Sequence, residues 1–330
     1  MTDTVELIEI GPREGLQYHP EYIPAQKKIA LANMLFDCGF RKVEVTSFVH
    51  PKVAPQMKDA VEVLLAIGPG GSQRIRQVLV PNETGCRSAI ACKSDEIAVW
   101  IFLSDRLSYS TLNRSVAETL KRISTICEIA GENAVKTNAY LGAAFGYPGE
   151  DAGHYENLRA MVAKLVQLGC RRVCLNDELA MANPVTVGDH LRACLAEVDA
   201  GYLAAHFYDN RGMGLANVFA AFESGVRVFK SSLGGAGRHG YLRSVISPDF
   251  PGRRDPHGLA TEDIVYGFEE MGIATGIDID RLIGCGRFLE KLLGTRLHSR
   301  VVESGLCGKT LELAKASLKT SEGRGRGGVA

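Results

Sequence analysis

The sequence predicts an α/β fold, a closed parallel (β/α)8 barrel with a C-terminal helical extension. Eight strand-like apolar runs alternate with stretches of helical periodicity as far as about residue 272. Polar and charged side chains follow several of these runs, and a barrel brings its strand ends to one mouth. A doubly wound open sheet is the alternative, but it usually has about five to seven strands and a glycine-rich nucleotide loop after the first. The predicted strands are 5–10, 42–46, 77–80, 97–102, 135–141, 172–175, 203–207 and 226–229.

Between these runs, apolar residues recur with the spacing of amphipathic helices. The pattern is clear over residues 31–38, 158–165 and 215–222, where each apolar set fits one buried face. Pro24 is placed to open the first of these helices and Gly39 to close it. We therefore expect a helix after each strand, as a barrel requires.

The last sixty residues have a different pattern. We assign 1–272 to the barrel and 273–319 to the extension, whose helical periodicity covers 282–293 and 311–318. We expect this extension to pack near the barrel mouth or at a contact between subunits, which favours a homo-oligomer. Residues 320–330 lack apolar anchors, and we expect them to be disordered.

Composition narrows the classes of partner. Lys plus Arg and Asp plus Glu both number 38 in a chain of 330 residues, so no net charge favours nucleic acid or an anionic membrane. Nine cysteines occur without a C-x-x-C pair, and no signal-like or membrane-length apolar segment opens the chain. We read the cysteines as reduced thiols of a cytoplasmic protein whose partners are small molecules.

Charged side chains near the ends of the first two strands are candidate catalytic groups. Arg13 and Glu14 follow a Gly-Pro break after the first strand. Arginine is a permanent cation suited to a carboxylate or a developing enolate, and Glu can bind a hard divalent ion. Glu44 alternates with β-branched neighbours, so it faces the barrel interior if they face the helices. A buried carboxylate needs a partner, and Arg13 on the neighbouring strand is the candidate.

Three later strands add further polar groups. Asp177 ends the sixth predicted strand, while His206 and Tyr208 stand two residues apart on the seventh and so project to the same side. After the eighth strand, residues 231–241 form a glycine-rich stretch that lacks the Lys-Ser/Thr ending of a phosphate loop. We expect it to be a mobile active-site loop that carries His239.

With these motifs in place, the chain resembles the 3-hydroxy-3-methylglutaryl-CoA lyase branch of the metal-dependent TIM-barrel lyases and Claisen-type synthases. The resemblance extends from residue 9 to about residue 276. It is carried by the segments 11–17, 44–49, 51–57, 81–82, 146–148, 215–217, 231–237 and 259–263.

The resemblance implies cleavage of a 3-hydroxy acyl thioester with the help of Mg²⁺ or Mn²⁺. Arg13 would stabilise the enolate, Glu44 would orient Arg13, and Asp177 would lie near the substrate hydroxyl. The metal would bind Glu14, His206 and Tyr208, and His239 would stand where the family has a cysteine thought to protonate the carbanion. Residues expected to contact the substrate are Gln17, Ser47, Phe48, Asn82 and Asn138.

Several positions depart from the family pattern. Glu14 replaces an Asp, Tyr208 replaces the second metal-binding histidine, and Gly258 replaces an Asn. Two outcomes are open. In the first, Glu14, His206 and Tyr208 hold a divalent ion and water fills the vacated positions. In the second, the ion is absent and Arg13, together with Lys230 at the end of the eighth strand, supplies the positive charge.

We interpret the chain as a carbon–carbon lyase that acts on a carboxylated 3-hydroxy acyl thioester, with a specificity shifted from that of the family. A condensing enzyme that acts on an oxo acid is one alternative. A non-catalytic barrel that binds a metabolite is the other, but several costly charges at one mouth speak against it.

Overall fold

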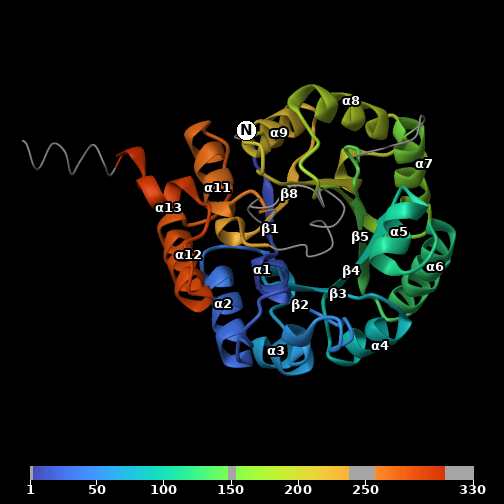
Figure 1. The fold of residues 1–330 in the computed structure, drawn as a ribbon, viewed down its shortest axis with the longest axis horizontal. Helices are drawn as coiled ribbons and strands as arrows, with labels where there is room; N and C mark the ends of the chain where they lie inside the picture. Colours follow the sequence, from blue (N-terminus) through green and yellow to red (C-terminus); the bar gives the residue numbers. More distant parts are fainter. Residues whose placement is uncertain (1–2, 148–153, 238–256, 309–330) are drawn as a thin grey trace, which may run out of the picture.

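The computed structural model describes residues 3–147, 154–237 and 257–308, and its strands form one closed parallel barrel in chain order (Figure 1). Each strand pairs with its sequence neighbours, and β1 closes the ring on β8. The eight strands that the sequence predicts are confirmed, with ends that differ by a few residues. The strands are β1 (Glu6–Glu9), β2 (Lys42–Ser47), β3 (Ile75–Leu79), β4 (Glu96–Phe102), β5 (Lys136–Gly142), β6 (Cys170–Asp177), β7 (Leu203–Phe207) and β8 (Val228–Ser231).

Helices surround the barrel as an outer layer (Figure 1). The three helices predicted from periodicity are confirmed as α2, α7 and α9. The helices are α1 (Gly11–Gln17), α2 (Ala25–Asp37), α3 (Ala60–Ile67), α4 (Glu83–Ala91), α5 (Asp105–Leu112), α6 (Val116–Glu132), α7 (His154–Gln167), α8 (Pro184–Leu195), α9 (Gly214–Glu223), α11 (Thr261–Glu270), α12 (Ile279–Leu293) and α13 (Arg300–Ser304). Within the described residues, no helix is both long and apolar enough to span a bilayer.

The helices begin and end at residues that the sequence marks as helix caps or helix breakers. Pro24 is the N-cap of α2, and Gly39 follows the helix with φ of 108°. A Cβ on Gly39 would lie 2.3 Å from the carbonyl oxygen of Gly276, so both the backbone angle and the close approach require glycine. Ser115 and Glu118 form a reciprocal capping box that starts α6.

A charged layer fills the barrel at the N-terminal ends of its strands. Lys42 Nζ lies 2.8 Å from a carboxylate oxygen of Glu96, and an Nη of Arg172 lies 3.0 Å from Glu6. Asn138 donates to Glu96 over 2.8 Å in the same layer. This network closes one end of the barrel, so ligands must enter from the other end.

The C-terminal extension packs against the outside of the barrel, next to α2 and α11 (Figure 1). Asp263 on α11 accepts hydrogen bonds from the Ser299 hydroxyl over 2.9 Å and from the Val301 backbone N–H over 3.0 Å. The predicted helix over 282–293 is confirmed as α12. The expectations for 311–318 and for 320–330 lie outside the described residues.

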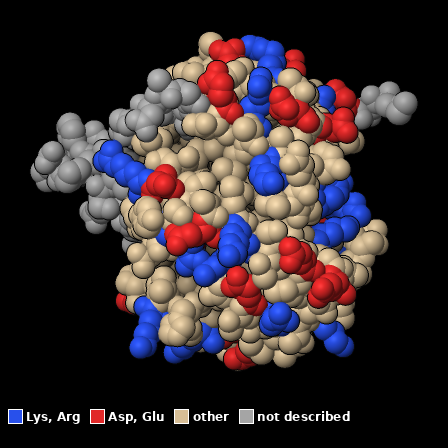
Figure 2. Space-filling model, turned by 90° about the vertical axis from the view of Figure 1, so that its right-hand side faces the viewer, with Lys and Arg blue, Asp and Glu red and all other residues tan. Residues whose placement is uncertain are grey.

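Charges on the outer surface are mixed. Figure 2 shows Lys and Arg interspersed with Asp and Glu on the face that lies at the right of Figure 1. A surface of mixed sign creates no strong local field for a polyanion. This face therefore agrees with the balanced composition.

Two buried carboxyl groups lie together behind the loop that follows β8. Glu9 accepts hydrogen bonds from the backbone N–H of Leu233 over 2.8 Å and from the Thr261 hydroxyl over 2.6 Å, while Glu262 accepts from the Gly234 N–H over 2.8 Å. Burial raises the pKa of Glu9 to about 7 and that of Glu262 to about 8, and the charge of Glu9 adds to the second shift.

This pair makes stability depend on pH. An unfolded chain releases both protons near pH 4.5, whereas the folded chain keeps them until about pH 7 to 8, so the free energy of unfolding should fall as pH rises through that window. Glu262→Gln should flatten this fall in urea titrations at a series of pH values. The exposed Glu132→Gln serves as control, and equal slopes in both variants would contradict the assignment.

Candidate active site

Arg13 and Glu44 form a buried ion pair at the open end of the barrel. The helix α1 begins directly after β1 and places Arg13 beside Glu44 on β2, where its Nε donates a hydrogen bond to Glu44 Oε1. Glu44 Oε2 accepts from the Gln77 amide on β3 and from the Tyr140 hydroxyl on β5 over 2.7 Å. Both predictions, that Glu44 faces the interior and that it pairs with Arg13, are confirmed.

The electrostatics keep Arg13 charged. Its exposed fraction is 2% and that of Glu44 is zero, so burial penalises both charges. The negative charges of Glu44 and Glu14 outweigh this penalty and raise the pKa of Arg13 well above its usual range. The second Nη lies 3.2 Å from Glu14 but makes no hydrogen bond within the described residues. Glu14 therefore provides a second counter-charge beside the guanidinium.

The three predicted metal ligands lie near one another. The His206 and Tyr208 rings are 5.1 Å apart, and the Tyr208 hydroxyl donates to Glu14. His206 Nδ1 lies 3.0 Å from the Asn176 side-chain oxygen. These contacts confirm that His206 and Tyr208 project to the same side of β7.

Their chemistry does not fit a divalent ion. Burial and the charge of Glu14 raise the pKa of Tyr208 well above its usual range, which favours the neutral hydroxyl that donates to Glu14. One oxygen of Glu14 faces this hydroxyl and the other faces Arg13. Within the described residues, no three His, Cys, Asp or Glu side chains converge as a metal site. In this structure the Tyr208 hydroxyl donates to Glu14, and its role as a metal ligand stays a prediction.

Lys230 places a second cation at this site. Its Nζ lies 3.7 Å from the centre of the Tyr140 ring, and it has no hydrogen-bond partner within the described residues. Burial lowers the pKa of Lys230, and the charge of Arg13 acts in the same direction. The cation therefore rests on an aromatic face, a contact that stabilises positive charge in a dry site.

Asp177 has a different environment from Arg13 and Glu44. Its carboxylate accepts hydrogen bonds from the backbone N–H groups of Met181 over 2.8 Å and Ala182 over 3.1 Å. Burial raises its pKa to about 7. The described contacts thus brace the loop that follows β6, and the role toward a substrate hydroxyl stays a prediction. His239 lies outside the described residues.

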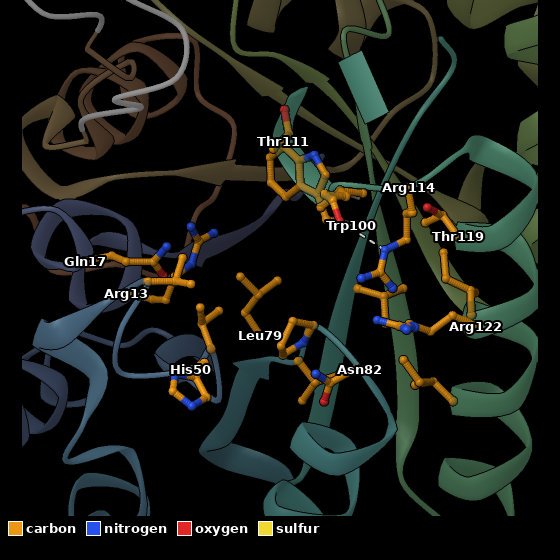
Figure 3. A pocket seen from close by; sticks show the side chains of 18 of the residues that line it. Arg13, Gln17, His50, Leu79, Asn82, Trp100, Thr111, Arg114, Thr119 and Arg122 are labelled. Carbon is orange, nitrogen blue, oxygen red and sulfur yellow. Dashed lines mark hydrogen bonds between the residues drawn. The ribbon is translucent and has the colours of Figure 1, made fainter. Parts of the chain in front are cut away.

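The predicted substrate-binding residues divide into two groups. Gln17 and Asn82 line a cavity that also reaches Arg13 (Figure 3), and the Ser47 hydroxyl donates to Gln17 over 3.2 Å. Phe48, which directly follows Ser47 in the sequence, is half-buried. Asn138 donates to Glu96 over 2.8 Å and to the Gln77 side-chain oxygen over 3.3 Å, so it lies between the charged layer and the Glu44 cluster, and its contact with a substrate stays a prediction.

Sequence reasoning missed Gln77 and Tyr140 as members of the site. Both side chains carry polar groups and bond Glu44 in the barrel interior; Tyr140 stands between Ala139 and Leu141, and Gln77 precedes Val78. The same alternation that identified Glu44 could have identified them.

Known proteins similar to this chain include hydroxymethylglutaryl-CoA lyases. A family model described as HMGL-like matches residues 4–289. Mitochondrial hydroxymethylglutaryl-CoA lyase of Bos taurus is 34% identical over 302 residues, covering 91% of this chain and 89% of the relative. The hydroxymethylglutaryl-CoA lyase of Bacillus subtilis is 34% identical over 300 residues, covering 90% of this chain and 95% of that relative.

Solved structures agree with these sequence relatives. The crystal structure of the Bacillus subtilis HMG-CoA lyase has a TM-score of 0.85 at 33% identity, covering 92% of this chain and 98% of that one. An HMG-CoA lyase from Acinetobacter baumannii in complex with coenzyme A and 3-methylmalate has a TM-score of 0.83 at 32% identity, covering 92% and 96%.

The buried pair generates a stability prediction. Glu44→Gln should lower the free energy of unfolding by about 3 kcal/mol, because Arg13 loses its buried counter-charge. Urea denaturation measures this change. Glu197→Gln removes a partly exposed pair with Arg159 and should cost under about 1 kcal/mol. Equal losses in the two variants would show that burial does not set the energy of the Arg13 pair.

Proposed function

This chain belongs to the HMGL-like family and is a carbon–carbon lyase, and from that premise we propose that protein cations stabilise the enolate released by its substrate. The proposed substrate is a carboxylated 3-hydroxy acyl thioester. The observation that supports this proposal most directly is the pair of buried cations, Arg13 and Lys230, on two sides of one cluster with Glu44 and Tyr140.

The proposed reaction is a retro-aldol, or retro-Claisen, cleavage. Asp177, which the sequence predicts to lie near the substrate hydroxyl, would accept the proton of the 3-hydroxyl, and C3 becomes a carbonyl carbon as the C2–C3 bond breaks. The electron pair of that bond becomes the enolate of the thioester, whose oxygen takes up negative charge. Protein cations that are already fixed at that oxygen lower the activation barrier, because they need not reorganise as the negative charge develops on the enolate.

Arg13 and Lys230 differ in what they can supply. Arg13 stays charged and is held in place by Glu44 and Glu14, and we assign its guanidinium to the thioester oxygen or the substrate carboxylate. Lys230 carries a proton that burial makes easier to lose. We assign it to the developing enolate oxygen. His239, predicted from the sequence, would protonate the carbon.

A divalent ion has no step in this proposal. The resemblance to metal-dependent lyases implies one, but Glu14 and Tyr208 are hydrogen-bonded to each other and Arg13 places a positive charge 3.2 Å from Glu14. Bringing a divalent cation to these residues would require breaking that hydrogen bond and would place like charges together.

The role of Lys230 predicts a pH profile. Only the protonated lysine stabilises an enolate, so the lyase rate should fall as pH rises through a lowered pKa, at a pH below 10.5. Lys230→Met should lower kcat about a hundredfold or more and remove this alkaline limb. Lys230→Arg should keep more of the rate and move the limb to higher pH.

Lys230→Met should fold normally, because it removes a buried charge that has no hydrogen-bond partner within the described residues. Thermal unfolding checks this. Steady-state rates with a panel of 3-hydroxy acyl-CoA thioesters test the proposal. A wild-type rate and pH profile in the folded Lys230→Met variant would refute the assignment.

Chelation offers an independent test. After dialysis against EDTA, and with metal content measured by elemental analysis, the lyase rate should stay within about twofold of its starting value, because cationic side chains supply the charge. Loss of the rate on dialysis, with recovery on addition of Mg²⁺ or Mn²⁺, would restore the metal-dependent mechanism.

A further inference from the structure

A cavity of about 330 Å³ opens beside Arg13 and extends outward between β3, β4 and α6 (Figure 3). Its middle is apolar, with walls from Leu79, Leu112 and Ile123. Its volume is at the lower end of the range for small-molecule sites. The cavity is thus large enough for part of a substrate that reacts at Arg13.

Two arginines form the far end of this cavity. Figure 3 shows the Arg114 and Arg122 side chains close together, opposite Arg13 and Gln17 across the apolar middle. Arg114 Nε donates to the Leu112 carbonyl over 3.0 Å. No Asp or Glu is among the described residues that line the cavity.

These two guanidinium groups are poorly neutralised. In the described chain, the only carboxylate within 4 Å of Arg122 belongs to Glu83, whose oxygen lies 3.7 Å from Arg122 Nε. Both side chains of this pair are partly exposed. Arg114 has no carboxylate within 4 Å in the same part of the chain. Two adjacent cations with so little counter-charge repel each other unless an anion lies between them. The arrangement is therefore suited to a bound carboxylate or phosphate.

We propose that this cavity is the subsite for the acyl tail of the substrate, and that the tail ends in a carboxylate held by Arg114 and Arg122. The inference rests on the proposed function, because it places the reacting end of the substrate at Arg13. An apolar passage with a cation at each end matches an aliphatic chain whose thioester end develops negative charge at Arg13 and whose far end is a carboxylate. A phosphate of the thioester's carrier has the same charge, but the apolar walls favour a hydrocarbon chain.

Trp100 provides a direct readout of this cavity. It is the only tryptophan of the chain, and it lines the cavity between the two charged ends. Its ring stacks on Tyr140, with centres 4.9 Å apart and planes inclined by 22°, and Tyr140 donates to Glu44. Intrinsic fluorescence therefore reports a ligand in the cavity without turnover.

The test compares two eight-carbon probes by titration of Trp100 fluorescence. Octanedioate carries a carboxylate at each end and octanoate at only one. Octanedioate should bind at least tenfold more tightly, since it engages both cationic ends. Arg122→Gln and Arg114→Gln should each remove most of this preference. Lys121→Gln, an exposed position next to Arg122 on α6, should preserve it.

The outcomes separate the tail subsite from the lyase chemistry. Equal binding of the two probes to the wild type, or a preference that survives both arginine substitutions, would overturn the tail carboxylate. A second result would also overturn the tail carboxylate. If coenzyme A quenches Trp100 fluorescence in an Arg122-dependent way and octanedioate does not, the two arginines bind the carrier. None of these measurements involves bond cleavage, so cleavage of a thioester without a tail carboxylate would leave the proposed function standing.

Discussion

The buried ion pair between Arg13 and Glu44 is the interaction on which the site depends. Removing two charges from water costs several kcal/mol for each ion, and attraction repays this only when the remaining donors and acceptors are also satisfied. Gln77 and Tyr140 supply those additional hydrogen bonds to Glu44. Four elements, α1, β2, β3 and β5, are thereby fixed relative to one another at the barrel mouth.

Tyr140 connects this pair to the rest of the mouth. Its hydroxyl binds Glu44, its ring carries the Lys230 ammonium group, and Trp100 stacks on it from β4. Tyr140 thus links the charged centre to Trp100, which lines the cavity that extends toward α6. Chemistry at Arg13 and recognition in the cavity share one rigid wall, and such rigidity keeps catalytic groups in productive geometry.

The fold also explains how this family can change the chemistry of its mouth. The strands fix where each side chain projects, so a substitution alters the functional group and leaves its position nearly unchanged. Tyr208 projects toward Glu14 from the place where the family has a histidine, and the result is a hydrogen bond between side chains. Lys230 adds a cation on the face of Tyr140. In the proposed mechanism, the positive charge at the mouth is carried by Arg13 and Lys230.

Local pattern in the sequence was sufficient for the eight strands, for the inward orientation of Glu44 and for its pairing with Arg13, because alternation along a strand decides which face a residue joins. Alternation does not tell how far along the barrel axis a residue lies. Asn138 and Tyr140 face the same interior two residues apart on β5, yet the first bonds Glu96 in the charged layer and the second bonds Glu44 at the site, because position along the strand sets their heights. The approach of Arg114 and Arg122 to the cavity that Arg13 enters likewise depends on how a loop and a helix pack over β3 and β4. Only the tertiary structure decides such distances, since they join residues that have no periodic relation along the chain.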